Sequence, residues 1–131
     1  MATYNGATYL PAQLQSYIEQ DRRPDELVVS DDCSTDDTRL LLVEFAKDAP
    51  FEVKILDNTD RLGYVGNFNR ALQNTSGDIV FLSDQDDVWF SQKIYKVIEF
   101  AKNRKTVLLF MNDAEIVNNY FQIPMQIIFH F

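Results

Sequence analysis

The sequence predicts an α/β layered fold in which a mostly parallel β-sheet is flanked by helices. Segments with helical spacing of apolar residues alternate with short apolar runs typical of buried strands. The chain has 131 residues, 46 % hydrophobic and 24 % charged, which fits one globular domain. Two clusters of aspartate directly follow predicted strands. Because ligands of such sheets bind outside the carboxyl ends of the strands, we expect both clusters to face one crevice.

The first half of the chain is predicted to supply two helix–strand pairs. Apolar residues at helical spacing predict an amphipathic helix over residues 7–20. Residues 26–30 form a short apolar run rich in β-branched side chains, which favours a buried strand. A helix over about 36–47 follows, and residues 51–56 alternate like a second strand.

The second half continues the alternation. Residues 58–66 are polar and contain glycine, so we expect a loop there. Apolar positions then mark a short helix around 68–72, a strand over 78–83, a helix around 94–101 and a strand over 106–111. The order of elements is that of a layered fold whose connections cross over between parallel strands.

Composition excludes several classes of protein. With 12 basic and 20 acidic residues the net charge is −8, which argues against nucleic acid as the main partner. The single cysteine, Cys33, excludes a disulfide framework. It has no adjacent His or Lys in sequence, so we do not expect a nucleophile, and we interpret the lone His130 as structural or disordered. No apolar run approaches the roughly 20 residues of a membrane span, so we expect a cytoplasmic protein; peripheral attachment at the inner membrane face stays open.

One aspartate cluster that could bind a ligand or a metal consists of Asp84, Asp86 and Asp87. It follows the apolar run 79–82. Alternate carboxylates after a strand can point the same way, and hard divalent cations prefer oxygen ligands. Such a cation can stabilise a diphosphate leaving group. The structural alternative is a turn whose aspartates cap the next helix.

The second cluster begins with Asp31 and Asp32. An acid pair at a strand end can accept hydrogen bonds from a base N–H or a sugar hydroxyl. The alternative is capping of the next helix by Ser34, Thr35 and Asp36. We expect both: capping by the later residues and ligand contact by Asp31 or Asp32.

Other candidate residues give weaker signals. Residues 3–6 form a turn signal before the first helix. Arg61 and Arg70 are the cations nearest the crevice in sequence, and surface salt bridges are favoured over diphosphate contact. Trp89 is expected to pack with its N–H hydrogen-bonded, with a sugar-flanking role as the alternative. Because the chain has no Walker A or G-x-G-x-x-G pattern, phosphate binding would depend on the metal.

Taken together, these motifs resemble a known enzyme family over roughly residues 2–115. The matching segments are residues 2–6, residues 24–27 and 30–36, Gly63 with residues 67–69, residues 77–79, and residues 83–89 with 93–94. Their order and spacing resemble the nucleotide-sugar-binding half of glycosyltransferase family 2, inverting enzymes of the GT-A (Rossmann-like) fold. The Asp-Gln-Asp-Asp-Val-Trp variant resembles rhamnosyltransferase-like members that decorate bacterial surface polysaccharides.

The resemblance implies roles for individual residues. The base pocket would be lined by Thr3 and Tyr4, and Asp86 would ligate Mn²⁺ or Mg²⁺ with Asp84 on the ribose or metal side. Cys33 stands where many members have glycine. The implied nucleotide-sugar-binding residues are Thr3, Tyr4, Asn5, Asp31, Asp32, Asp84 and Gln85, and the implied metal ligands are Asp86 and Asp84.

Two departures from the family's pattern follow. The family's first strand normally precedes Thr3, and only two residues of it are present. The family's general base lies in the acceptor half, well beyond the metal motif, so no catalytic residue is assigned. We therefore expect a partial GT-A domain over residues 1–117 and an unassigned apolar tail over 118–131. An exposed apolar tail is an aggregation hazard, so we expect residues 126–131 to pack on the opened sheet or on a second copy in a homodimer.

The leading functional hypothesis is metal-assisted, inverting transfer of a sugar from a UDP- or dTDP-type donor to a hydroxyl of a saccharide or lipid-linked acceptor. The first alternative is a nucleotide-binding fragment without turnover, favoured by the missing base. The second is a nucleotidyltransferase, which also uses a metal and a nucleotide. That class normally shows a glycine-rich basic loop after the first strand, which this sequence lacks.

Overall fold

The computed structural model describes residues 1–102, 104, 109, 115–116 and 125–126. The chain divides into two compact units, Met1–Glu99 and Phe100–Phe131. Most of the predicted strand over 106–111, His130 and the tail residues 127–131 lie outside the described residues. The boundary expected at residue 117, the packing of the tail and the homodimer therefore stay predictions. In the described part of the chain, no helix is long and apolar enough to cross a membrane.

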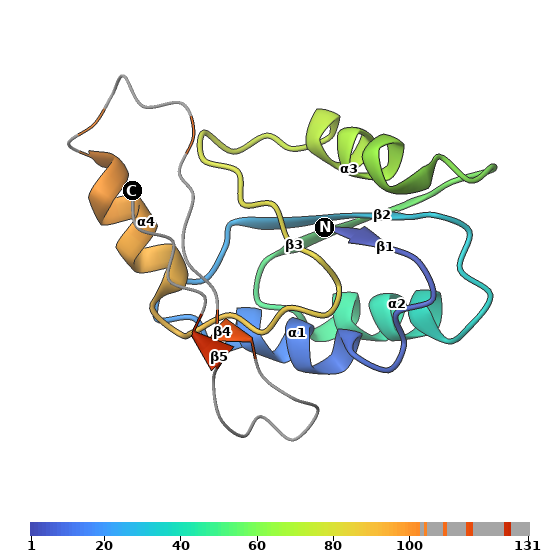
Figure 1. Ribbon diagram of the computed structural model, residues 1–131, viewed down its shortest axis with the longest axis horizontal. Helices are drawn as coiled ribbons and strands as arrows, with labels where there is room; N and C mark the ends of the chain where they lie inside the picture. Colours follow the sequence, from blue (N-terminus) through green and yellow to red (C-terminus); the bar gives the residue numbers. More distant parts are fainter. Residues whose placement is uncertain (103, 105–108, 110–114, 117–124, 127–131) are drawn as a thin grey trace. The chain divides into compact units, whose positions relative to one another are not determined.

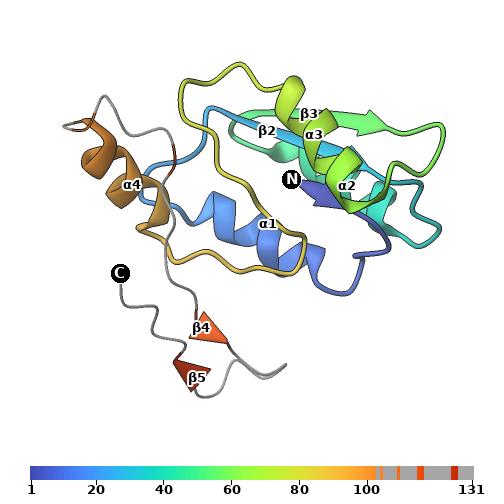
Figure 2. The ribbon, with the colours of Figure 1, turned by 45° about the horizontal axis from the view of Figure 1, so that its top comes forward.

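A parallel sheet of three strands forms the centre of the first unit. The strands are β1 (Ala2–Thr3), β2 (Glu26–Asp31) and β3 (Glu52–Asp57), in the spatial order β1-β2-β3. All six residues of β2 pair with β3, whereas β1 pairs with β2 only through its two residues. Figure 2 shows the three strands side by side, with the N-terminus at β1. The predicted α/β fold with a parallel sheet flanked by helices is confirmed.

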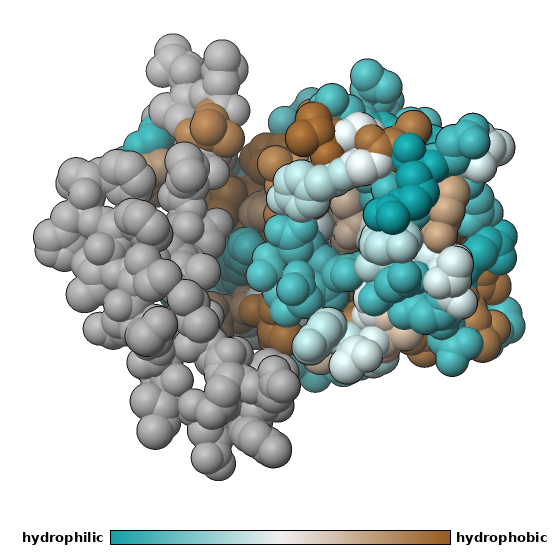
Figure 3. Space-filling model, turned by 45° about the vertical axis from the view of Figure 1, so that its right-hand side comes forward, coloured by the Kyte–Doolittle hydropathy of each residue, from teal (hydrophilic) through white to brown (hydrophobic). Residues whose placement is uncertain are grey.

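Helices cover both faces of this sheet. In Figure 1, α1 (Leu10–Ile18) and α2 (Thr38–Asp48) lie on one side and α3 (Gly63–Gln73) lies on the other. The helix α4 (Lys93–Lys102) follows the connection from α3. The face shown in Figure 3 intersperses apolar residues among hydrophilic ones over the described part of the chain.

The second unit contains the antiparallel pair β4 (Glu115–Ile116) and β5 (Met125–Gln126).

The predicted strand over residues 78–83 does not form; this segment is irregular. A strand needs a neighbouring backbone edge, and the edge strand β1 is only two residues long. Residues 79–83 instead line an apolar cavity of about 250 Å³ together with Leu27 and Val28 of β2 and with side chains of α3. Several side chains of the run therefore stay partly exposed, as for Ile79 at 40 % and Leu82 at 63 %.

The helix α3 begins within the segment predicted as a loop. It starts at Gly63, whose φ of +70° is left-handed and suits a glycine. Its first residue is preceded by Leu62, which makes no side-chain cap of its own. The cap comes instead from Asp32, which is far away in sequence. Its carboxylate accepts hydrogen bonds from the backbone N–H groups of Leu62 and Gly63.

Buried side chains join α1 to the segment around Asp84, from Ser83 to Trp89. The Tyr17 ring lies edge-on to Trp89 with centroids 4.9 Å apart, and both are buried. The packing role predicted for Trp89 is confirmed, but the expected hydrogen bond is not found, because its buried Nε1 has no partner among the described residues. The Tyr17 hydroxyl lies 2.6 Å from Ser83 Oγ and accepts a 2.7 Å hydrogen bond from Gln13 Nε2. Burial raises the pKa of Tyr17.

We expect Tyr17→Phe to lower the free energy of unfolding by about 1–3 kcal/mol, because buried polar groups of Gln13 and Ser83 lose a partner. Urea unfolding measures the change. The matched control is Tyr9→Phe, since Tyr9 is 48 % exposed. Equal stability of the Tyr17→Phe variant and the parent would show that this buried hydrogen-bond network contributes nothing net.

Candidate functional site

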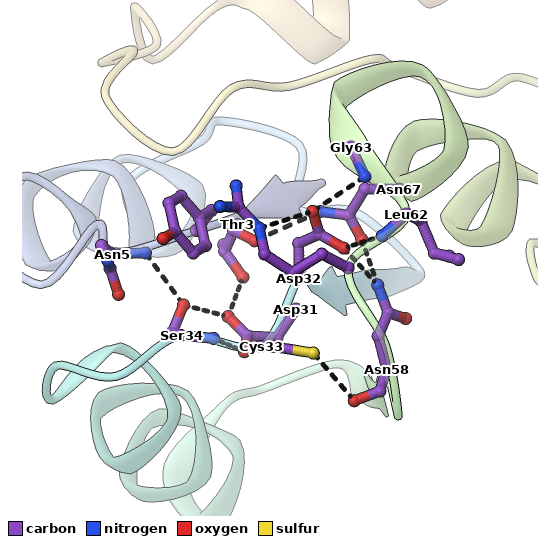
Figure 4. A network of polar contacts seen from close by, with 12 residues as sticks. Thr3, Asn5, Asp31, Asp32, Cys33, Ser34, Asn58, Leu62, Gly63 and Asn67 are labelled. Atoms are coloured by element: carbon purple, nitrogen blue, oxygen red, sulfur yellow. Dashed lines mark hydrogen bonds and ion pairs between the residues drawn. The ribbon is translucent and has the colours of Figure 1, made fainter.

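The carboxyl ends of β1 and β2 bring the first predicted site residues together (Figure 4). Thr3 is paired with Asp31 in the ladder, and its Oγ1 donates to Asp31 Oδ1 at 2.8 Å. Asp31 also accepts from Ser34, through Oγ at 2.6 Å and through the backbone N–H at 2.9 Å. The Asp31 carboxylate is buried and committed to holding the turn that follows β2.

The next carboxylate, Asp32, receives donors from α3 and its approach. Its Oδ1 accepts from Leu62 N at 2.6 Å and from Asn58 Nδ2 at 2.9 Å, and its Oδ2 accepts from Gly63 N at 3.0 Å. Burial alone would raise the pKa of Asp32. The hydrogen bonds, together with the Arg61 guanidinium, whose Nε lies 3.8 Å from Asp32 Oδ2, hold that pKa below its usual range. A carboxylate oxygen accepts about two hydrogen bonds, so Oδ2 can accept one more.

The turn after β1 is tied to the turn after β2. Asn5 adopts a φ of 48°, its N–H donates to Ser34 Oγ at 2.9 Å, and its Oδ1 accepts from Thr35 N at 2.8 Å. The predicted capping is made by Asp36, which accepts from Thr38 N at 3.0 Å at the start of α2. Ser34 and Thr35 serve instead to hold Asn5.

Cys33 lies at the same turn, with a φ of 62° in the left-handed region. That conformation is easiest for glycine, which is the residue the resemblance expected here. Its Sγ donates to the Asn58 carbonyl at 3.3 Å.

The second acidic cluster is less buried than the first. Asp84 is partly buried, whereas Asp86 and Asp87 are exposed. Burial, and after it repulsion by Asp87 and Asp86, raises the pKa of Asp84. A cation bound beside Asp84 would relieve this repulsion, so cation and proton compete for the same carboxylate.

A pocket of about 310 Å³ lies between these clusters. It is lined by Ala2, Thr3, Tyr4, Asp32, Arg61, Tyr64, Asn67, Asp84, Gln85 and Asp86. Of the predicted site residues, Asn5 and Asp31 are not among the lining residues. Asp32 of one cluster and Asp84 and Asp86 of the other all line this pocket, which agrees with the expectation that the two aspartate clusters face one crevice.

One wall of the pocket is a cationic stack. The Arg61 guanidinium lies 3.7 Å from the centroid of the Tyr4 ring, a cation–π contact worth about 0.5–1 kcal/mol at an exposed site. Arg70 is not a lining residue and donates to Asn58 Oδ1 instead. Sequence reasoning missed Tyr64 and Asn67; Asn67 donates to the Thr3 carbonyl at 3.2 Å and lies in one of the matching motifs, whereas Tyr64 has no sequence signal.

The donor set suits a divalent cation that a ligand helps to bind. In residues 1–102, no group of three or more His, Cys, Asp or Glu side chains is placed to hold a metal by itself. Asp84 and Asp86 both line the pocket. Mg²⁺ is typically held by one or two carboxylates together with water and substrate phosphates, so this pair fits such an ion.

Known proteins share this sequence and arrangement. The sequence model of the family "Glycosyl transferase family 2" matches residues 1–130. The chain is 38 % identical over 103 residues to the dTDP-rhamnosyl transferase RfbG of Shigella flexneri, covering 76 % of this chain and 36 % of that protein. It is 32 % identical over 119 residues to the UDP-Glc:alpha-D-GlcNAc-diphosphoundecaprenol beta-1,3-glucosyltransferase WfgD of Escherichia coli, covering 91 % of this chain and 46 % of that protein. The chain thus spans less than half the length of either relative.

Solved structures agree with the sequence comparison. TarS of S. aureus (residues 1–349) superposes with a TM-score of 0.71 at 31 % identity, covering 79 % of this chain and 31 % of TarS. The mannosyltransferase PcManGT of Pyrobaculum calidifontis, in complex with GDP-Man and Mn²⁺, gives a TM-score of 0.68 at 30 % identity, covering 75 % of this chain and 30 % of that protein. These matches confirm the expected GT-A fold class, and the chain belongs to glycosyltransferase family 2.

Proposed function

We propose that this chain binds a nucleoside-diphosphate sugar of the UDP or dTDP type for inverting, metal-dependent transfer of the sugar to a hydroxyl acceptor. The observation that carries the proposal is the pocket in which Asp32, the Arg61–Tyr4 stack and Asp84 with Asp86 meet. TarS has been solved with UDP and with UDP-GlcNAc, and the similar rhamnosyl transferase is named for a dTDP donor. These names support donors of both types.

The pocket suggests how the donor is divided among its residues. The ring of Tyr4 and the open acceptor position of Asp32 Oδ2 suit a pyrimidine base, whose imide N–H is a donor. Arg61, the cation of the pocket lining, suits the diphosphate. Asp84 and Asp86 would hold the divalent cation, which stabilises the departing diphosphate when bound.

The acceptor is inferred from a relative and not from residues of the pocket. We propose a saccharide or lipid-linked acceptor in bacterial surface polysaccharide synthesis, at the cytoplasmic face of the membrane. The glucosyltransferase WfgD is named for a diphosphoundecaprenol-linked acceptor, which supports this. We assign no described residue as the base that deprotonates the acceptor hydroxyl, so a chain that only binds nucleotide stays an alternative. Family membership removes the support for a nucleotidyltransferase.

The test is a thermal-shift panel of UDP-, dTDP- and GDP-sugars, each with Mn²⁺ or with a chelator. We expect UDP- or dTDP-sugars with Mn²⁺ to raise the unfolding temperature, because a ligand at 100 times its Kd adds about 2.7 kcal/mol to the free energy of unfolding. GDP-sugars should give a smaller shift, since guanine, although it also carries a ring N–H donor, is larger than the pyrimidine base proposed for this site. A panel in which no nucleotide sugar shifts the transition contradicts the proposal.

A further inference from the structure

The side chain of Gln85 is bonded to the backbone of Tyr4. Its Oε1 accepts from Tyr4 N–H at 2.9 Å, and its Nε2 donates to the Tyr4 carbonyl at 3.1 Å. The carboxamide therefore satisfies both backbone groups of one residue, as a neighbouring strand would. It does so directly beyond β1, where the predicted strand over 78–83 does not form.

Gly6 makes room for this contact. A Cβ added to Gly6 would lie 2.3 Å from Gln85 Oε1 and 2.4 Å from Gln85 Cδ. Gly6 is not among the residues with positive φ, so an alanine here meets no backbone obstacle. Space for the Gln85 carboxamide is therefore what this glycine supplies.

Gln85 stands between the two proposed metal ligands, Asp84 and Asp86. On one side of it the chain is anchored by Ser83, whose Oγ contacts Tyr17 in the core. The Gln85 carboxamide is the second anchor, and it fastens the segment to the residue whose ring forms the stacked wall of the pocket. The Gln85 side chain thus links two segments, the acidic segment (residues 84–87) and the Tyr4 turn (residues 4–6, directly after β1).

We infer that Gln85 is a positioning residue that couples cation binding at Asp84 and Asp86 to nucleotide binding at the Tyr4 turn. This inference rests on the proposed function. A nucleotide diphosphate with its cation must contact both segments at once, so their relative position decides whether the two are bound together or one at a time. Without the carboxamide, each segment keeps its own ligand groups but loses its fixed distance from the other.

The experiment measures the affinity of the full chain for UDP by titration calorimetry, with Mn²⁺ and with a chelator. The ratio of the two dissociation constants is the metal-dependent gain, a coupling between two ligands. For Gln85→Ala we expect this gain to fall about tenfold, while the affinity in chelator stays within about twofold of the parent. Gln85→Met, which keeps the side-chain length without the hydrogen bonds, should behave alike.

Gly6→Ala supplies an independent variant in which residue 85 is still glutamine. Its methyl group displaces the carboxamide from Tyr4, so the gain should fall by a similar factor. In the double variant Gly6→Ala/Gln85→Ala the methyl group has space, and we expect no loss beyond that of Gln85→Ala alone. Gln92→Ala, at an exposed glutamine of the same connection, is the control and should keep the full gain.

The outcomes separate the two proposals. A parent chain that binds UDP with no gain from Mn²⁺, or does not bind UDP, contradicts the proposed function and with it this inference. A parent with a gain that Gln85→Ala and Gln85→Met both retain overturns the positioning role alone. Equal losses with Mn²⁺ and with chelator also overturn it, because a merely structural side chain would weaken both.

Discussion

Asp86→Asn is expected to reduce the Mn²⁺-dependent affinity for a nucleoside diphosphate to the level measured in chelator. Replacing partners outside the coordination shell typically costs 10–100-fold in metal affinity, so loss of a direct carboxylate ligand should cost about 100-fold or more. Asp86 lines the pocket beside Asp84, and an ion held by one or two carboxylates has no further protein ligand to replace one that is lost. Calorimetric titration with UDP and Mn²⁺ measures the change.

The same substitution should not lower the unfolding temperature of the ligand-free chain. Asp86 is exposed, and its charge is one of the causes that raise the pKa of Asp84. Neutralising it removes a repulsion and costs no buried contact. Asp21→Asn, an equal charge change at an exposed residue, is the control. If Asp86→Asn binds UDP and Mn²⁺ as tightly as the parent, the metal assignment is wrong.

The parts of the fold that could be predicted are those whose signal is local. A buried apolar run located β2 and alternation located β3, while helical spacing located α1 and an N-cap signal located α2. The run over 78–83 has the same local signal but does not form a strand. Whether an apolar run becomes a strand depends on an adjacent backbone edge, which is a tertiary feature and is not visible in the run itself. Here the edge strand β1 is only two residues long. The early start of α3 was missed for a similar reason, because Asp32 caps it from a distant strand end.

The candidate site shows the same division. Convergence of the two acidic clusters followed from the rule that strand carboxyl ends share one edge. Which of Asp31 and Asp32 lines the pocket did not follow, because it depends on the pairing of Thr3 with Asp31. That pairing commits Asp31 to Thr3 and leaves Asp32 on the side of α3. The position of Arg61 over Tyr4 depends on the path of a loop, which leaves no periodic signal.

Asp32→Asn is expected to act on stability and on binding together. The carboxylate accepts from three donors, Leu62 N–H, Gly63 N–H and Asn58 Nδ2. An asparagine replaces one acceptor oxygen with an NH₂ group that faces a donor, and residue 32 is only 2 % exposed. We expect the free energy of unfolding to fall by about 1–3 kcal/mol at neutral pH. Asp25→Asn, at an exposed carboxylate, is the control.

The effect of Asp32→Asn on stability should depend on pH with a definite sign. Since the pKa of Asp32 is held below its usual range in the folded protein, its contribution is fully present above the unfolded-state pKa of about 4. It is lost as the pH falls through the folded-state pKa. The stability difference between parent and variant should therefore shrink in acid and be constant above about pH 5. A difference that grows in acid would contradict the hydrogen-bonded, ionised state of this carboxylate.

Binding of a pyrimidine nucleotide should weaken as well in Asp32→Asn, by about 10- to 100-fold, which is the free energy of one hydrogen bond to a charged acceptor. The loss should appear with Mn²⁺ and with chelator alike, because the proposed contact is to the base and involves no cation. That distinguishes it from Asp86→Asn, whose loss is confined to the metal-dependent gain. Adenine nucleotides, whose base has no ring N–H donor on its pairing edge, should bind the variant and the parent with similar affinity. If UDP binds the variant and the parent equally well, Asp32 is only the cap of α3, and the base contact must be assigned to another residue of the pocket.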